Sequence, residues 1–83
     1  MSTWEFEKVY ARDIMVGDYI CGYDGSWSKP GLVMEITIQP GLTIDRFFFV
    51  HDGFFPNPEL YGLDMFTRLT DAGKLKFEAQ LFP

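Results

Sequence analysis

Apolar residues recur at every second position over several stretches of this chain, a period typical of strands rather than of helices. The alternation holds over the first five positions of the segment 4–10, where Trp4 and Phe6 are expected to face inward, and it is cleanest in residues 74–81. In a strand, this pattern packs one face against a core and leaves the other face in water. We therefore expect a strand in each segment, with Phe77 facing the core in the second.

Turn signals separate further strands in the middle of the chain. The Asp24-Gly25 pair is typical of a hairpin, and Pro40-Gly41 marks a second reversal, across which the flanking strands are antiparallel partners. A short helical turn is expected within residues 11–18. The predicted strands of this region are 19–23, 32–38, 42–51 and 63–69. A single helical turn fits the last of these segments nearly as well as a strand does.

Two of these predicted strands have distinctive faces. The even-numbered residues of 32–38 are all apolar, so their face is expected to be more buried than the face that carries Glu35. In 42–51, the run from Phe47 to Phe49 interrupts the alternation and makes both faces apolar near the middle. Such a strand is either covered on both sides or leaves a phenylalanine available to a partner.

The segment 52–62 is the longest predicted loop, because its two Gly and two Pro residues exclude a helix or a central strand. It is also rich in apolar and aromatic residues, and a surface loop of this composition must fold back on the core or contact a partner. Both roles stay open, and the same holds for the tryptophan beside the first hairpin turn. The residues expected to bind a partner are Trp27, Phe54, Phe55 and Tyr61.

Five or six short strands without a long helical period predict an all-β or mostly β chain. We expect a single domain over residues 1–83, formed by a small antiparallel SH3-like barrel or rolled sheet of five to six strands with at most one short helical turn. Residues 13–20, followed by Asp24-Gly25 and Trp27, resemble the entry into the first hairpin of SH3-like and Hint-like small barrels. The sequence lacks the nucleophile and the histidine-asparagine ending of self-splicing Hint domains, so splicing chemistry does not carry over.

The charge balance disfavours direct nucleic-acid binding. Seven Lys and Arg residues stand against twelve Asp and Glu residues, which gives a net charge of −5 and a mean field that repels phosphate. The basic residues are scattered, and only Lys74 and Lys76 are close enough to share one strand face. No apolar run is long enough for a membrane-spanning helix, and residues 1–7 lack the features of a secretory signal. We therefore expect a cytoplasmic protein with no membrane partner.

Candidate reactive groups are few. Cys21 is the only cysteine and lies in the middle of a predicted strand, where a buried thiol is inert. His51 is the only histidine and lies beside Asp52, so a general base or a metal ligand is considered. A strand-end residue that bonds to the following turn explains His51 better, and turn chemistry explains the aspartates around the first hairpin. The sequence predicts no catalytic residue, no metal ligand and no cofactor.

These observations favour a non-catalytic interaction module that binds a protein partner or itself through aromatic loops and exposed strand edges. The alternative is an acidic phage-type inhibitor, a nucleic-acid mimic that occupies a basic groove of a nucleic-acid-handling enzyme. A mimic would gather its carboxylates into one stripe, formed here by Glu5, Glu7, Asp13, Asp18 and Asp24. A minimal hydrolase that uses His51 is a third hypothesis, in which His51→Ala abolishes turnover and leaves the fold unchanged.

Overall fold

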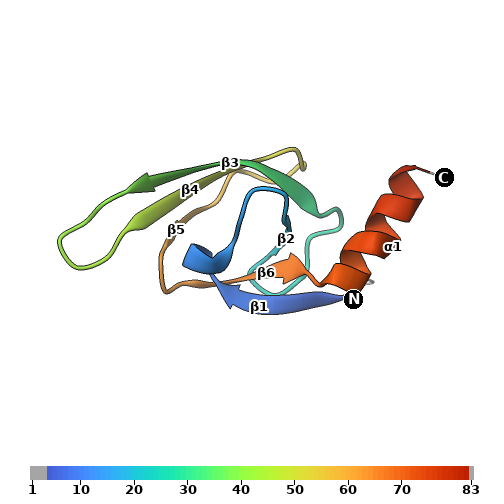
Figure 1. Ribbon diagram of the computed structural model, residues 1–83, viewed down its shortest axis with the longest axis horizontal. Coiled ribbons are helices and arrows are strands. Elements are labelled where there is room, and N and C mark those ends of the chain that lie inside the picture. Colours follow the sequence, from blue (N-terminus) through green and yellow to red (C-terminus); the bar gives the residue numbers. More distant parts are fainter. Residues whose placement is uncertain (1–3, 83) are drawn as a thin grey trace.

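The computed structural model describes residues 4–82 and shows, over that range, one antiparallel sheet of six strands followed by a helix (Figure 1). The strand order is β1-β6-β2-β3-β4-β5. The predicted mostly β, antiparallel fold is therefore confirmed. In chain order the elements are β1 (Phe6–Tyr10), the 3-10 turn η1 (Ala11–Asp13), β2 (Tyr19–Gly22), β3 (Gly31–Gln39), β4 (Arg46–His51), β5 (Glu59–Tyr61), β6 (Met65–Leu69) and α1 (Asp71–Leu81).

Most of the predicted elements have a counterpart in the structure. The first strand, the helical turn and the two hairpins are confirmed, and residues 63–69 contain the strand β6 rather than a helical turn. β4 begins only at Arg46, so residues 40–45 form the loop of the β3–β4 hairpin. The predicted loop 52–62 contains β5, a strand of three residues at the edge of the sheet, where proline is tolerated nearby.

The sheet is strongly curled, so that its two edge strands approach each other. The backbone N–H of Ala11, just after β1, donates to the carbonyl oxygen of Asp64 at 2.8 Å. The N–H of Arg12 donates to the carbonyl oxygen of Gly62, just after β5, at 3.2 Å. Among residues 4–82 no strand pairing joins β1 to β5, so η1 bridges the gap in a rolled sheet.

The interior of the roll holds the main core, and a smaller core lies beneath α1. The members of the main core are Ala11, Ile14, Ile20, Val33, Phe47, Phe49, Leu60 and Phe66. The smaller core consists of Tyr19, Cys21, Leu69 and Phe77, with Trp4 and Leu32 packed against it. In β4, Phe47 and Phe49 are buried, whereas the other face is only partly covered, with Phe48 half-buried and Val50 exposed.

The predicted buried face of β3 is wrong at the start of the strand, where Val33 rather than its even-numbered neighbours enters the main core, and it agrees with the structure only from Ile36 onward, because a β-bulge shifts the register. Val33 pairs with His51 but Glu35 pairs with Val50, so Met34 is an extra residue in this strand. An extra residue exchanges the two faces. Val33 therefore faces the core before the bulge and Ile36 after it, whereas Met34 is 51% exposed.

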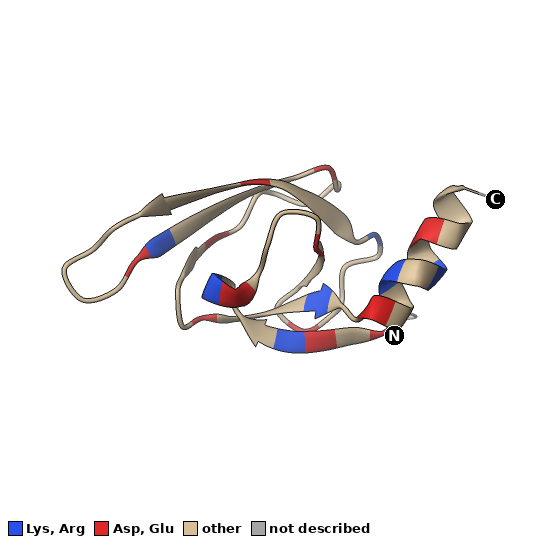
Figure 2. Cartoon of the chain, in the orientation of Figure 1, with Lys and Arg blue, Asp and Glu red and all other residues tan. Residues whose placement is uncertain are grey.

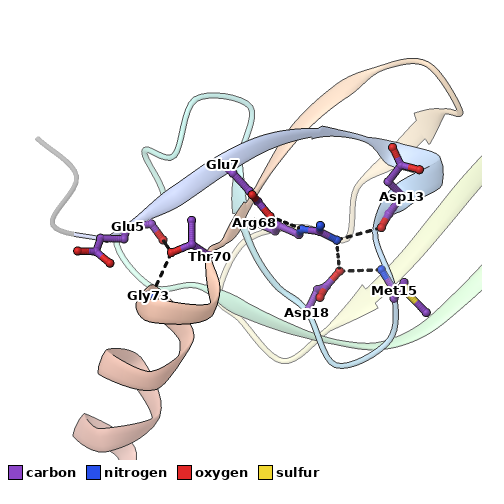
Figure 3. Close-up of polar contacts among 8 residues, drawn as sticks. All are labelled: Glu5, Glu7, Asp13, Met15, Asp18, Arg68, Thr70 and Gly73. Carbon is purple, nitrogen blue, oxygen red and sulfur yellow. Dashed lines mark hydrogen bonds and ion pairs between the residues drawn. The ribbon is translucent and has the colours of Figure 1, made fainter.

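The predicted C-terminal strand 74–81 is also wrong, because this segment lies within the helix α1. Residues 71–82 contain no β-branched residue and are rich in Ala, Leu, Lys, Glu and Gln, which favour helices. The hydroxyl of Thr70 accepts a hydrogen bond from the N–H of Gly73 at 3.1 Å and caps the first turn (Figure 3). None of the helices within residues 4–82 has the length and apolar character needed to cross a bilayer.

Phe77 attaches α1 to the sheet. It is 5% exposed, and its ring meets the rings of Trp4 and Tyr19 edge-on at centroid distances of 5.1 and 5.0 Å. The other alternating apolar residues of the segment point away from the sheet, and Leu75 is 71% exposed. The helix therefore projects from one end of the molecule while the β3–β4 hairpin projects from the other (Figure 1), and the extents of the chain are 46 × 21 × 20 Å.

Candidate functional site

An aromatic stack joins the loop before β3 to the loop after β4. The rings of Trp27 and Phe55 stack at a centroid distance of 4.7 Å with an interplanar angle of 12°. Trp27 also lies 5.0 Å from the ring of His51 and meets the core residue Phe66 edge-on at 5.8 Å. The two predicted contact residues Trp27 and Phe55 are half-buried and cover one end of the core.

Phe54 stands beside this stack and points into water. Its side chain is 82% exposed, and the ammonium nitrogen of Lys29 lies 4.8 Å from its ring centroid, within cation–π range. We call Trp27, Lys29, Phe54 and Phe55 the aromatic surface. Its members come from two loops that are more than twenty residues apart in the sequence but adjacent in space.

Hydrogen bonds fix the loop that carries Phe54. The Asp52 carboxylate accepts from the N–H of Leu32 at 2.8 Å, and the side-chain oxygen of Asn57 accepts from the N–H of His51 at 3.2 Å. The N–H of Gly53 donates to Nδ1 of His51 at 2.9 Å. The exposed ring of Phe54 is therefore displayed on a braced loop rather than on a loose one.

His51 has a structural role in this loop, as the sequence predicted for a strand-end residue. With Nδ1 accepting from Gly53, the proton lies on Nε2, which is 3.3 Å from the carbonyl oxygen of Pro56. Both ring nitrogens of this buried residue are thus engaged. In the described part of the chain, no group of three or more His, Cys, Asp or Glu residues is placed to hold a metal ion.

Cys21 offers no nucleophile either. Its side chain is fully buried in the smaller core, and burial raises the pKa of the thiol to about 12. The reactive thiolate is therefore almost absent at neutral pH. The prediction that Cys21 is a buried core residue is confirmed.

Tyr61, the fourth predicted contact residue, lies apart from the aromatic surface. It pairs with Arg46 at one end of β4, whereas Trp27 packs on His51 at the other end, about 16 Å along the strand. The Tyr61 hydroxyl accepts from Nη2 of Arg46 at 2.9 Å, and Nη1 of Arg46 lies 3.0 Å from Oε1 of Glu59. These contacts form a separate polar cluster on the outer side of β4 and β5.

A pocket that no sequence pattern predicts lies beneath the tip of the β3–β4 hairpin. This pocket has a volume of about 310 Å³ and is lined chiefly by Arg12, Leu42, Ile44, Phe47 and Leu63. Leu42 and Ile44 lie in the hairpin loop rather than in a strand, where they remain exposed. Leu42 and Ile44 directly follow the Pro40-Gly41 turn, and this position is the sequence signal for the pocket, although the pattern itself predicts strand residues there.

Several carboxylates are neutralised within the chain. Arg68 bonds to Oε1 of Glu7 at 2.9 Å, to Oδ2 of Asp18 at 3.0 Å and to the carbonyl oxygen of Asp13 (Figure 3). Burial alone would lower the pKa of the guanidinium, but the two carboxylates outweigh it and the pKa is raised. Lys76 pairs with Glu5 at 2.9 Å, and acidic and basic residues are interspersed over β1, β6 and α1 (Figure 2).

The chain thus has a rolled β-sheet with a braced aromatic surface at one end of β4 and a projecting hairpin at the other. No family model, curated protein or solved structure matches the chain. Its function is therefore inferred from the surface itself.

Proposed function

We propose that this chain is a non-catalytic protein-interaction module that binds a protein partner, or a second copy of itself, through the aromatic surface. The observation that carries the proposal is Phe54, which is 82% exposed on a loop braced by hydrogen bonds. Leaving a phenylalanine side chain in water forgoes about 1.5–3 kcal/mol of burial free energy. Large aromatic side chains that are both exposed and held in place are typical centres of protein interfaces.

Trp27 and Phe55 support the same interpretation. Their stack rests on the core residue Phe66, so a partner would meet a surface that is already ordered and would lose little conformational entropy on binding. Lys29 adds one positive charge beside the Phe54 ring. A partner with an apolar centre and a carboxylate at its rim fits this arrangement. We include Tyr61 as a second, separate contact in the proposal.

We also propose that the chain has no catalytic activity and is located in the cytoplasm. The nitrogens of His51 are both engaged and the thiol of Cys21 is buried, so neither is offered as a nucleophile or base. We propose a cytoplasmic location because the one cysteine is a free thiol, as is usual in reducing compartments.

The experiment compares Phe54→Ala with Leu75→Ala, a matched change of an exposed apolar residue on α1. Partners are first identified by photo-crosslinking from position 54 in an extract of the source cells, and their dissociation constants are then measured by calorimetry. We expect Phe54→Ala to weaken binding by about tenfold or more and Leu75→Ala to leave it unchanged. Equal affinities of the parent and Phe54→Ala would refute the proposal.

Salt separates this function from the nucleic-acid mimic. An aromatic interface should change its affinity by less than about threefold between low and high salt, whereas a mimic of nucleic acid should lose affinity steeply. Three of the five carboxylates that a mimic would use are paired within the chain, those of Glu5, Glu7 and Asp18. Those pairs favour the interaction module over the mimic.

A further inference from the structure

β3 has a free edge along most of its length. It is nine residues long, but its pairing with β2 involves only Gly31 and Leu32, with further backbone bonds at Val33. On its other side it pairs with β4 as far as Gln39. Within residues 4–82, no strand pairs with residues 34–39 on the β2 side, and in Figure 1 nothing lies beyond this part of β3.

The pairing of β4 shows which backbone groups face that edge. The N–H of Phe49 donates to the carbonyl oxygen of Pro58 at 3.1 Å, so the backbone groups of Phe49 point toward β5. In an antiparallel ladder, two residues that lie opposite each other direct their N–H and C=O groups either toward each other or both away from each other. Ile36, which is opposite Phe49, and Ile38, which is opposite Phe47, therefore direct their N–H and C=O groups to the free edge.

When two copies of this edge pair antiparallel, outward-pointing residues must meet outward-pointing residues, and three such registers are centred between Ile36 and Ile38. A two-fold axis at Ile38 places Ile36 opposite Pro40, which has no N–H to donate. An axis at Ile36 places Ile38 opposite Met34, whose backbone is displaced by the bulge. An axis at Thr37 uses both outward-pointing residues fully.

We propose that the free edge of β3 is a self-association site, at which two copies of the chain pair antiparallel about a two-fold axis at Thr37. In this register Ile36 forms hydrogen-bonded pairs with the partner's Ile38, and Glu35 lies opposite the partner's Gln39. Thr37 lies opposite the partner's Thr37, a favourable cross-strand pair. No two like charges are opposed, whereas a two-fold axis at Glu35 would place Glu35 opposite its own copy.

This dimer is weak and transient. A pairing of five residues falls short of the roughly 1,000 Å² that stable interfaces bury, and two chains of net charge −5 repel each other. We therefore expect a dissociation constant between about 10 μM and 1 mM that becomes smaller as salt is added. The dimer leaves both aromatic surfaces free, so it presents two of them to a bivalent partner.

Disulfide trapping tests the register directly. Thr37→Cys places two thiols opposite each other in a non-hydrogen-bonded pair, where the Cα separation of about 4.5 Å suits a disulfide. The matched control is Gln39→Cys, whose two copies would lie about 13 Å apart along the strands. Cys21 is fully buried and does not compete. We expect Thr37→Cys to form covalent dimers at least about tenfold faster than Gln39→Cys under mild oxidation; equal rates would overturn the register.

Sedimentation velocity at concentrations up to about 1 mM tests the dimer itself. Ile38→Pro removes an N–H that faces the free edge and no bond of the β3–β4 ladder, and it should weaken dimerisation about tenfold. Thr37→Glu and Thr37→Lys should each weaken it, and an equimolar mixture of the two should restore it. A parent chain that stays monomeric throughout overturns the proposal. So does a dimer that Ile38→Pro leaves intact and Phe54→Ala abolishes, which would assign self-association to the aromatic surface.

Discussion

Removing the Phe77 side chain tests whether α1 is an integral part of the fold. Phe77→Ala deletes the one large side chain that α1 buries, together with its edge-on contacts to Trp4 and Tyr19. Such a change in a core costs about 3–5 kcal/mol, of which each aromatic pair supplies about 0.5–1.5 kcal/mol. Among residues 4–82 the smaller core has four buried members, and Trp4 and Leu32 beside it are only partly buried, so these neighbours can relax into the space. We expect a loss of about 3 kcal/mol.

That loss is a large part of the total stability. A chain of 83 residues has an unfolding free energy of roughly 4–12 kcal/mol. The assay is urea unfolding followed by tryptophan fluorescence and circular dichroism. Because Trp4 contacts Phe77, its emission should shift in the folded variant as well. If α1 undocks without global unfolding, the helical signal should fall at lower urea than the fluorescence signal of Trp27 in the main core.

Leu75→Ala is the matched control on the same helix. Leu75 is 71% exposed and both residues favour helices, so this change should alter the unfolding free energy by less than about 0.5 kcal/mol. A loss below about 1 kcal/mol for Phe77→Ala, or an equal loss for the two variants, would show that α1 is not attached through Phe77.

Two further predictions concern the glycines with positive φ angles and the buried thiol of Cys21. Gly22 and Gly17 both have positive φ angles, 93° and 97°, but a Cβ at Gly22 would lie 2.6 Å from the Trp27 ring whereas a Cβ at Gly17 would meet nothing within 4 Å. Gly22→Ala should therefore cost about 2 kcal/mol or more in thermal or urea unfolding, and Gly17→Ala about 1 kcal/mol; equal costs would exclude the ring contact as the cause. Cys21 should react with a thiol reagent at pH 8 on the order of 100-fold more slowly in the native chain than in urea. Because burial raises its pKa from 9.0 to about 12, its stabilising effect should be complete below pH 9 and decline as the pH rises toward 12. Rapid native labelling would contradict its burial.

The strands that the sequence predicts correctly are those bounded by turn residues. Asp24-Gly25 and Pro40-Gly41 fix where the chain reverses, and the antiparallel pairs β2–β3 and β3–β4 follow from them. The strand order could not be predicted, because the central strand β6 pairs with both β1 and β2 from more than forty residues away. Such long-range pairing depends on the shape of the whole core and not on a local pattern.

Two of the differences between the predicted and the observed fold have local physical causes. Alternation over eight residues suggested a strand at 74–81, but helix-forming side chains and the Thr70 cap prevail because only Phe77 needs burial. In β3 the alternation itself was correct on each side of Met34, and a single bulged residue exchanged the faces. A bulge has no reliable signature in one sequence, since it is set by pairing with β4.

The candidate site was only partly visible in the sequence. Composition indicated that the loop 52–62 was unusually apolar, and the structure shows how its parts divide: Phe55 covers the core, Leu60 enters it and Phe54 remains outside. This division could not be predicted because it depends on Trp27 reaching the same end of the roll from another loop. Tyr61 is predicted as a contact because it is an aromatic residue of the same apolar loop, but β5 places it at the other end of β4.

The edge strands β1 and β5 are poorly suited to pair with another chain, whereas the free edge of β3 is well suited to it. β1 is five residues long and carries Glu7 and Lys8, and β5 is three residues long and follows two prolines. Short strands, charged side chains and proline are among the means by which proteins prevent edge-to-edge association. The outer half of β3 has little of this protection: it is long, reaches Gln39 before a proline appears, and carries Glu35 as its single charge. An edge that is left open while the other two are protected is best explained by a partner strand.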